Sequence, residues 1–370
     1  AWAALGGTLL AGAMLMKQSG VVFLVFGLAW LLLATVEERR PWLAGIGACA
    51  LGAAAPLVLT AGILVATGVF GRFWLWTMQY GTAYVSLDVP APSSSLLWGV
   101  QAAAPLYGLA GFAALSALWD LQSRRAVAVA LPLFGAAALG SAAGFYFRPQ
   151  YFLLLTPPVA VLAGVGAVAV TRPLRRKTAR AAVAVALVAA GVASALWLQR
   201  EFFFRMDPRL LARAAYEYNP FPEALEIGRW LRANSRPEDR IAILGSEPEI
   251  FFYARRRSAT GHVYMYPLME AQPYARAMQA EMIREIEAAA PTWLIVVWVK
   301  WSWLMRPESD VTVLRWAEPY VAQHFERVGV ADIVAADRTE YRWGAEAAGY
   351  TIRSPDRVEV FRRRTAASVR

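Results

Sequence analysis

Seven long apolar runs fill the first 199 residues of the chain, and they constrain its fold more than any other feature. The runs cover about residues 1–16, 20–36, 42–69, 95–119, 126–146, 150–170 and 181–199. A helix that spans a bilayer needs roughly 20 apolar residues. The whole chain is 58% hydrophobic, which exceeds the usual share in a soluble domain. We therefore expect a polytopic α-helical membrane domain with about seven transmembrane helices.

Charged residues are distributed unevenly, and their distribution divides the chain. Residues 1–199 contain four acidic residues and twelve Lys or Arg, whereas residues 200–370 contain 23 acidic residues and 25 Lys or Arg. The composition changes near Phe204–Pro208. Because each part is long enough to fold around its own core, we expect a transmembrane domain over residues 1–200 and a second domain over residues 207–370.

The second domain contains short apolar runs that alternate with amphipathic segments. The predicted strands are Ile241–Leu244, Thr292–Val299, Val328–Val334 and Arg357–Phe361, and the predicted helices are Phe221–Ala233 and Tyr274–Ala289. This alternation is typical of a small α/β domain with a mostly parallel sheet. After the first strand, Ser246–Glu249 (SEPE) fits a capping box that opens a helix.

Basic residues between the apolar runs indicate which connections face the cytoplasm. Nine Lys or Arg lie in the connections at Glu37–Pro41, Gln122–Arg125 and Arg172–Arg180, and the alternating connections carry one each, at Lys17, Arg72 and Arg148. Under the positive-inside rule the first set is cytoplasmic. We therefore expect an integral membrane protein whose second domain is extracytoplasmic. These loops account for most of the net charge of +10, so a nucleic-acid partner is not expected.

The stretch Phe145–Ala160 places Arg148 between two long apolar runs. A guanidinium near the bilayer core costs at least a few kcal/mol. At the membrane surface it can meet a phosphate, which matches its planar shape and permanent charge. Lys17 lies in a similar turn on the same side, so we predict that both cations bind the phosphate of a lipid donor. The alternative is that both are interfacial residues that only anchor helix ends.

Four tyrosines are predicted to bind substrate. Tyr80 lies in the long outward connection Phe70–Ser95, Tyr151 follows Arg148, and Tyr264 and Tyr266 line a loop of the second domain. Aromatic rings suit the headgroup zone of a membrane, and the pair in the second domain can form the roof of a sugar or acceptor site. The alternative for that pair is packing onto the membrane domain.

One carboxylate is a candidate for the catalytic base. Asp88 is the only acidic residue in the outward loops of the membrane domain, and a glycosyl transfer needs a base to deprotonate the acceptor. A solvated loop residue explains Asp88 equally well. His262 and His324 have no Cys or His partner at metal-ligand spacing. We therefore expect no cofactor, and no motif supports a divalent metal.

Several short segments resemble one family of membrane enzymes. They are Leu15–Gln18 (LMKQ), Phe147–Tyr151 (FRPQY) running into Thr156–Pro158 (TPP), Asn219–Glu223 (NPFPE), Leu244–Pro248 (LGSEP) and Thr260–Pro267. Together they resemble the polyprenyl-phosphate-dependent glycosyltransferases of the GT-C fold, the group that includes protein O-mannosyltransferases and aminoarabinose transferases. The resemblance covers essentially the whole chain.

The resemblance implies an enzyme of the bacterial inner membrane that moves a sugar from a polyprenyl-phosphate donor to an acceptor on the outer face, with inversion at the anomeric carbon. It implies a catalytic Asp in the first outward loop of the family, and no position here matches that motif. Since the chain starts at Ala1 inside an apolar run, we expect an N-terminally truncated member. The resemblance places Lys17 and Arg148 where they can face the donor phosphate.

Two functions from other classes remain as alternatives. A transporter or flippase for a lipid-linked sugar would show broken helices with polar residues at mid-membrane depth, and the apolar runs here are almost uniformly apolar. A non-catalytic scaffold would use the second domain to bind a partner. The sugar and the acceptor cannot be read from the residues.

Overall fold

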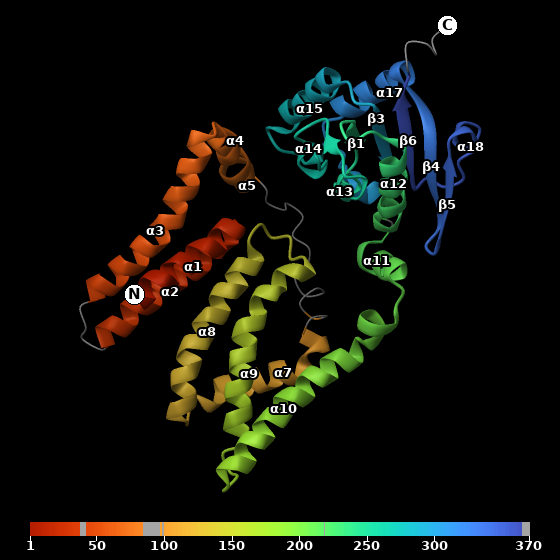
Figure 1. The fold of residues 1–370 in the computed structure, drawn as a ribbon. Helices are drawn as coiled ribbons and strands as arrows, with labels where there is room; N and C mark the ends of the chain where they lie inside the picture. Colours follow the sequence, from red (N-terminus) through yellow and green to blue (C-terminus); the bar gives the residue numbers. More distant parts are fainter. Residues whose placement is uncertain (38–41, 84–96, 98–99, 218, 365–370) are drawn as a thin grey trace. The chain divides into compact units, whose positions relative to one another are not determined.

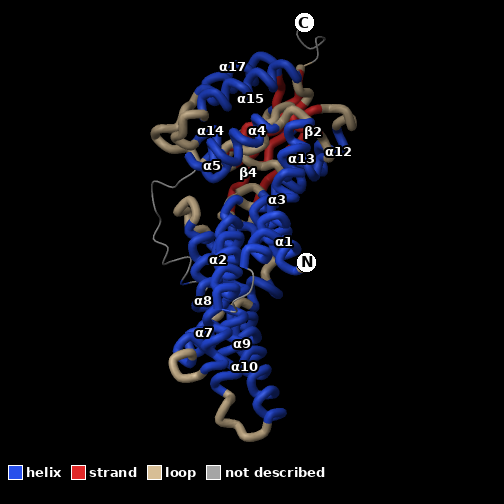
Figure 2. The backbone as a smooth tube through the Cα atoms, turned by 90° about the vertical axis from the view of Figure 1, so that its left-hand side faces the viewer, coloured by secondary structure: helices blue, strands red, loops and turns tan. Residues whose placement is uncertain are grey.

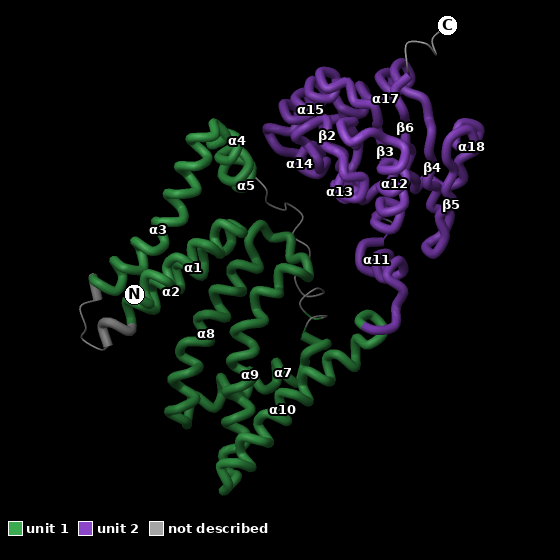
Figure 3. Tube along the Cα trace, in the orientation of Figure 1, with its two compact units in different colours: residues 1–203 green, residues 204–370 purple. Residues whose placement is uncertain are grey.

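The computed structural model describes residues 1–37, 42–83, 97, 100–217 and 219–364. The chain divides into two compact units, residues 1–203 (unit 1) and residues 204–370 (unit 2), as Figure 3 shows. The division lies beside the change in composition at Phe204–Pro208.

The described residues of unit 1 fold almost entirely into helices (Figure 1). In chain order these are α1 (Trp2–Met16), η1 (Gln18–Gly20), α2 (Val21–Glu37), α3 (Trp42–Ala66), α4 (Phe70–Trp74), η2 (Leu75–Gln79), α5 (Tyr80–Ala83), α7 (Ala104–Ser116), α8 (Leu121–Ala142), η3 (Pro149–Leu155), α9 (Thr156–Val170) and α10 (Lys177–Leu198). A π-helical segment, η4 (Glu201–Arg205), crosses the boundary into unit 2.

Four of these helical segments are long and apolar enough to cross a membrane. They are Ala44–Ala66, Leu121–Ala142, Pro149–Val170 and Lys177–Leu198, and shorter apolar helices cover Trp2–Met16, Gln18–Leu33 and Ala104–Ser116. Large apolar side chains point outward from them, with Leu139 70% and Val185 69% exposed. Exposing such surface to water is unfavourable, so these helices indicate a membrane-embedded protein.

Small residues bring the helices of unit 1 into close contact. A Cβ atom on Gly7 of α1 would lie 1.9 Å from the carbonyl oxygen of Cys49 in α3, and one on Gly166 of α9 would lie 1.9 Å from that of Leu109 in α7. Thr8 Oγ1 also donates to the carbonyl oxygen of Gly52 across the α1–α3 contact at 3.0 Å. In lipid, helices associate through van der Waals packing and hydrogen bonds of this kind, because lipid chains remove the hydrophobic driving force.

The segment that begins the span Pro149–Val170 is a 3₁₀-helix rather than an α-helix. Pro157 and Pro158 follow it and lack the amide hydrogens that would bond to the carbonyls of Leu153 and Leu154. The chain therefore adopts the narrower 3₁₀-helix over η3 and becomes α-helical only from Thr156.

Unit 2 combines one six-stranded sheet with helices. Its elements are α11 (Pro208–Tyr216), α12 (Phe221–Asn234), β1 (Arg240–Leu244), α13 (Glu249–Ala254), β2 (Arg257–Ser258), α14 (Tyr266–Met269), α15 (Ala275–Ala289), β3 (Trp293–Trp298), α16 (Lys300–Trp303), α17 (Thr312–His324), β4 (Phe325–Ala335), β5 (Arg338–Trp343), α18 (Ala345–Ala348) and β6 (Arg357–Arg363). Figure 2 shows the strands of the sheet surrounded by helices within this unit.

The prediction of a mostly parallel sheet is wrong. The strand order is β2-β1-β3-β6-β4-β5, with β1 parallel to β2 and β3 and the other three pairings antiparallel. A hairpin joins β4 directly to β5 through Ala336 and Asp337, and a short connection of this kind can only reverse the chain. The result is an α/β sheet with a parallel half and an antiparallel half.

The core of unit 2 lies on one face of the sheet under α12 and α13. Ile227 and Leu231 from α12 pack with Ile243 of β1, Ile295 of β3 and Val360 of β6, all at most 2% exposed. Neighbouring strand residues point to the other face. There Leu244 and Val296 line a groove together with Leu314 and Val321 of α17, so α17 lies over that face.

We predict that Gly166→Ala destabilises unit 1, because its methyl group would collide with the backbone of α7. Overpacking of this kind costs about 1–3 kcal/mol. The matched control is Gly164→Ala in the same helix, where nothing lies within 4 Å of the added Cβ atom. Thermal unfolding of the purified protein should show a clear loss for the first variant and none for the second, and equal melting temperatures would contradict the α7–α9 packing.

Candidate functional site

The turn after α1 contacts the turn that leads into α9. Lys17 ends α1 with an extended backbone, at φ −156° and ψ 135°. Its Nζ atom lies 3.8 Å from the centroid of the Tyr151 ring, which is a cation–π contact. Figure 1 shows the end of α1 beside the loop that joins α8 to η3. Two residues that are remote in sequence, and both predicted to bind substrate, are thus brought together.

Small residues and one hydroxyl group hold the two turns against each other. A Cβ atom on Gly140 would lie 3.2 Å from side-chain atoms of both Leu154 and Val22, so glycine permits the close packing of α8, η3 and α2. Ser141 Oγ lies 2.9 Å from the carbonyl oxygen of Tyr151. It lies at the same distance from the carbonyl oxygen of Ala137, so its single proton is shared between α8 and the backbone that carries the Tyr151 ring.

The loop that carries Arg148 has an unusual backbone. Gly144, Phe145 and Phe147 all have positive φ, at 79°, 57° and 45°. Positive φ costs free energy for residues with a Cβ atom, and such strain is often found at functional sites. The strain in two phenylalanines thus lies directly before Arg148.

Arg148 is half-buried and packs on an aromatic ring. Its guanidinium carbon lies 5.4 Å from the centroid of the Tyr146 ring, and it sits at the N-cap position of η3, three residues before Tyr151. In the part of the chain that the structure describes, neither Arg148 nor Lys17 forms an ion pair with a carboxylate. Both cations remain available to an external anion, and a phosphate suits them.

The remaining predicted site residues are Tyr80, Asp88, Tyr264 and Tyr266, and the cation–π contact between Lys17 and Tyr151 does not include them. Tyr80 is 8% exposed and packs edge-on against Trp76, so its ring is buried. Asp88 lies outside the described residues. Tyr264 and Tyr266 belong to unit 2, where their ring centroids are 4.4 Å apart and the hydroxyl of Tyr266 donates to the carbonyl oxygen of Trp301 at 2.5 Å.

Among the described residues, no three His, Cys, Asp or Glu side chains are placed to hold a metal ion. His262 Nε2 instead lies 3.2 Å from Glu281 Oε2 within unit 2. Nothing in the described part of the chain therefore suggests which residues would bind a divalent cation.

A groove in unit 2 was missed by the sequence analysis. It has a volume of about 1060 Å³ and lies between α17 and the ends of β1, β3 and β6. Most of its lining is apolar, including Trp298, Trp303, Leu314 and Phe361. The groove depends on α17, a helix that was not predicted because Pro319 interrupts its pattern.

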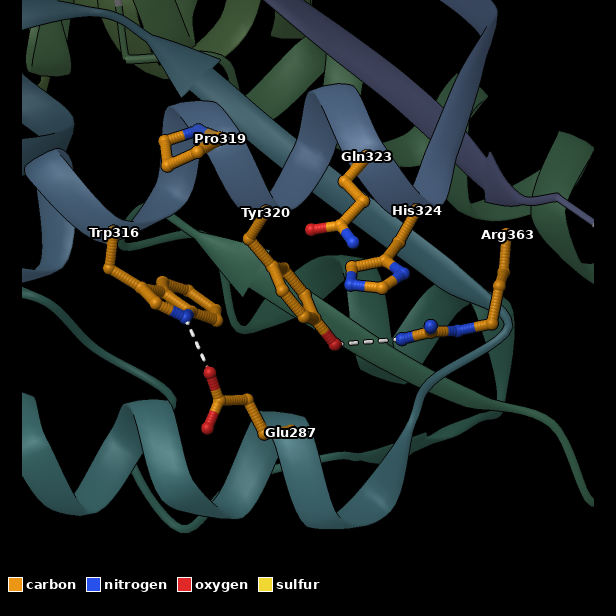
Figure 4. Close-up of a pocket in the computed structure, with 7 residues that line it drawn as sticks. All are labelled: Glu287, Trp316, Pro319, Tyr320, Gln323, His324 and Arg363. Atoms are coloured by element: carbon orange, nitrogen blue, oxygen red, sulfur yellow. Dashed lines mark hydrogen bonds between the residues drawn. The ribbon is translucent and has the colours of Figure 1, made fainter.

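A second, smaller cavity of about 430 Å³ is lined by residues of α17, by Glu287 of α15 and by Arg363 of β6, and is shown in Figure 4. The Trp316 ring stacks on Tyr320 with centroids 4.5 Å apart, and the His324 ring is tilted by 58° against Tyr320 at 4.9 Å. Trp316 Nε1 donates to Glu287 at 2.8 Å, and Arg363 Nη2 donates to the Tyr320 hydroxyl at 2.7 Å. Because these polar groups already bond one another, the cluster is explained by packing of α17 on α15 and β6.

Glu247 is buried and Glu249 is half-buried where β1 ends. The predicted capping box is wrong, because Ser246 Oγ accepts from the backbone N–H of Met265 and Pro248 occupies the N-cap position of α13. Glu247 accepts a hydrogen bond from Ser302 at 2.9 Å. Burial raises the pKa of Glu247 to about 8, against the opposing effect of Ser302, and burial raises the pKa of Glu249 to about 7.

No protein-family model matches this chain, and no curated protein sequence matches it. Its function must therefore be inferred from the side chains that the fold brings together.

Glu247 and Glu249 predict a pH-dependent stability for unit 2. In the unfolded chain they ionise near their ordinary pKa of 4.5, whereas in the folded unit they keep their protons up to about pH 8 and 7. The unfolded state therefore loses protons first, and the free energy of unfolding should fall as pH rises from about 4.5 to 8. Hydrogen exchange of the β1 and β3 amides, corrected for the intrinsic rate at each pH, measures this slope.

Glu247→Gln should flatten that slope while retaining a side chain that can bond to Ser302. The control is Glu238→Gln, because Glu238 is exposed and removing its charge should leave the slope unchanged. Identical slopes in the wild type and Glu247→Gln would contradict the buried, protonated carboxyl.

Proposed function

We propose that this chain belongs to a membrane glycosyltransferase that takes a sugar from a polyprenyl-phosphate donor and transfers it to an acceptor on the outer face of a bacterial inner membrane. The observation that carries the proposal is the contact of Lys17 with Tyr151, at 3.8 Å. It joins the two turns that the resemblance to GT-C glycosyltransferases singles out. Both turns carry a cation beside apolar helices.

The chemistry of the donor explains why cations are needed there. When the bond between the sugar and the lipid phosphate breaks, negative charge develops on the phosphate, and fixed positive groups stabilise it. Lys17 supplies a compact ammonium and Arg148 a planar guanidinium that can bond two phosphate oxygens. The aromatic rings of Tyr146 and Tyr151 orient these cations, and the exposed apolar sides of the helices suit the prenyl chain.

The proposed membrane topology follows from the charges. Basic residues gather at the start of α8 and in the α9–α10 connection, whereas Lys17 and Arg148 lie at turns near the other end of α8. With the basic end in the cytoplasm, the turns and unit 2 lie outside, and the three shorter apolar helices complete seven spans. The base that activates the acceptor is not assigned, since Asp120 caps the opposite end of α8 and pairs with Arg172.

We predict that Lys17→Gln and Arg148→Gln each weaken binding of polyprenyl phosphate to the full chain in nanodiscs by about 10–100-fold. This is the loss expected when a charge-assisted hydrogen bond of about 1.5–3 kcal/mol is removed. Arg72→Gln is the matched control, because it removes the same charge from another outward connection. Lys17→Arg and Arg148→Lys keep the charge and should retain most of the affinity.

The same preparations distinguish the proposed enzyme from its alternatives. Release of polyprenyl phosphate from a lipid-linked sugar, reduced in Lys17→Gln and Arg148→Gln, would support transfer. Movement of the intact lipid-linked sugar across vesicles without release would indicate a flippase. Unchanged binding in both variants would show that these cations only anchor helix ends, and the proposed donor site would have to be abandoned.

A further inference from the structure

The ends of α8 and α9 opposite the Lys17–Tyr151 contact carry a dense positive surface. We call it the basic surface, and its members are Arg124, Arg125, Arg172, Arg175, Arg176, Lys177 and Arg180. They come from the first turn of α8, the α9–α10 connection and the first turn of α10. Figures 1 and 2 both show the α9–α10 connection at one end of this helix group.

Contacts within unit 1 hold the two parts of the basic surface together. Arg172 forms an ion pair with Asp120 and donates from Nη2 to Gln122 Oε1 at 3.4 Å, which joins the α9–α10 connection to the start of α8. Arg180 donates from Nη2 to the carbonyl oxygens of Arg172 and Leu174, at 3.0 and 3.1 Å. An ion pair and hydrogen bonds therefore hold Arg172 and Arg180 of the basic surface in defined positions.

The positive charge of this surface is not neutralised by the protein. Asp120 is its one acidic neighbour in the described chain, and that carboxylate already accepts from the backbone N–H of Ser123 at 2.7 Å as the N-cap of α8. Arg175, Arg176 and Lys177 are exposed and have no ion-pair partner among the described residues.

Arg176 and Lys177 lie at the N-terminus of α10, which is a further reason to expect a bound anion there. Lys177 begins α10, a 22-residue helix whose first turn contains no acidic residue. The N-terminus of a helix carries partial positive charge, so cations there are unfavourable unless an anion is bound.

The apolar residues beside the basic surface indicate where that anion comes from. Trp119 is 66% exposed and Leu121 is 70% exposed, directly before the basic residues of α8. A soluble anion would not require apolar neighbours, whereas a lipid headgroup brings acyl chains with it. Trp in particular is enriched where headgroups meet acyl chains.

We propose that the basic surface is a binding site for anionic phospholipid headgroups. The phosphates contact Arg175, Arg176 and Lys177, and the part of the acyl chains nearest to the headgroup contacts Trp119 and Leu121. The site is separate from the proposed donor site and does not depend on the glycosyltransferase function. It would fix the depth of the α7–α8 and α9–α10 connections in the cytoplasmic leaflet and tie the stability of unit 1 to the lipid composition.

The test uses the full chain in nanodiscs of phosphatidylcholine with a defined fraction of phosphatidylglycerol of the same acyl chains. Native mass spectrometry counts the phosphatidylglycerol molecules that remain bound. Each cation near a membrane surface contributes about 1 kcal/mol to attraction of anionic lipid. The variant R175Q/R176Q/K177Q should therefore bind phosphatidylglycerol about 100-fold more weakly than the wild type.

Two further variants make the result specific. R232Q/R236Q/R284Q removes three exposed charges from unit 2 and should bind phosphatidylglycerol as the wild type does. R175K/R176K keeps the charge and should also retain binding, which separates loss of charge from misfolding. Equal losses in R175Q/R176Q/K177Q and R232Q/R236Q/R284Q would overturn the proposal.

Competition with inorganic phosphate shows whether the basic surface binds a lipid headgroup or a soluble anion. Trp119→Ala should weaken phosphatidylglycerol binding, and millimolar inorganic phosphate should compete poorly. If inorganic phosphate displaces the lipid completely and Trp119→Ala has no effect, the surface binds a soluble anion, and the assignment to lipid headgroups is wrong.

Discussion

Exposed apolar surface on long helices is the constraint on which the rest of unit 1 depends. The helices touch through glycine and other small residues, as where Gly7 meets Cys49 and Gly166 meets Leu109. At such contacts the helices approach closely along one face only. Side chains on the other faces, such as Leu139 and Val185, point outward. A soluble protein would bury this surface in its core, whereas here the lipid covers it. Charged side chains such as Lys17, Arg148 and Arg172 consequently lie at the helix ends.

The two ends of α8 and α9 carry different chemistry for this reason. At one end the cations are few, and each rests on an aromatic ring, Lys17 on Tyr151 and Arg148 on Tyr146. At the other end the cations are many and exposed. A pair of oriented cations beside an apolar surface suits a single phosphorylated ligand, whereas a broad positive surface suits the general negative charge of a leaflet. One helix pair thus serves two kinds of phosphate recognition in our proposals.

Unit 2 follows the rules of a soluble domain. Its sheet is covered on one face by α12 and α13, and α17 lies over the other with a groove of about 1060 Å³ beneath it. The buried Glu247 lies where the parallel strands β1 and β3 end, the edge at which ligands bind in many α/β folds. Its hydrogen bond with Ser302 gives it a structural role at that edge.

The sequence by itself determined the features that depend on long or strongly periodic patterns. Apolar runs predicted membrane helices, and four of them have the length and composition to cross a bilayer. The apolar runs at Ile241–Leu244 and Thr292–Val299 predicted β1 and β3, because a buried strand excludes charge. The strand β5 was missed because RTEYRW is mostly polar and lies at the sheet edge, where it pairs only with β4. Its support from the core, through Tyr341 and Trp343, cannot be read from the local pattern.

Only the tertiary structure decided which distant residues meet. Nothing in the local pattern of Lys17 or Tyr151 shows that their side chains are in contact, because the contact depends on how α2, α8 and η3 pack around Gly140. The direction of β6, which makes the sheet mixed, likewise depends on its antiparallel partners β3 and β4. Sequence patterns record burial along one element, whereas contacts between elements depend on packing that no single segment encodes.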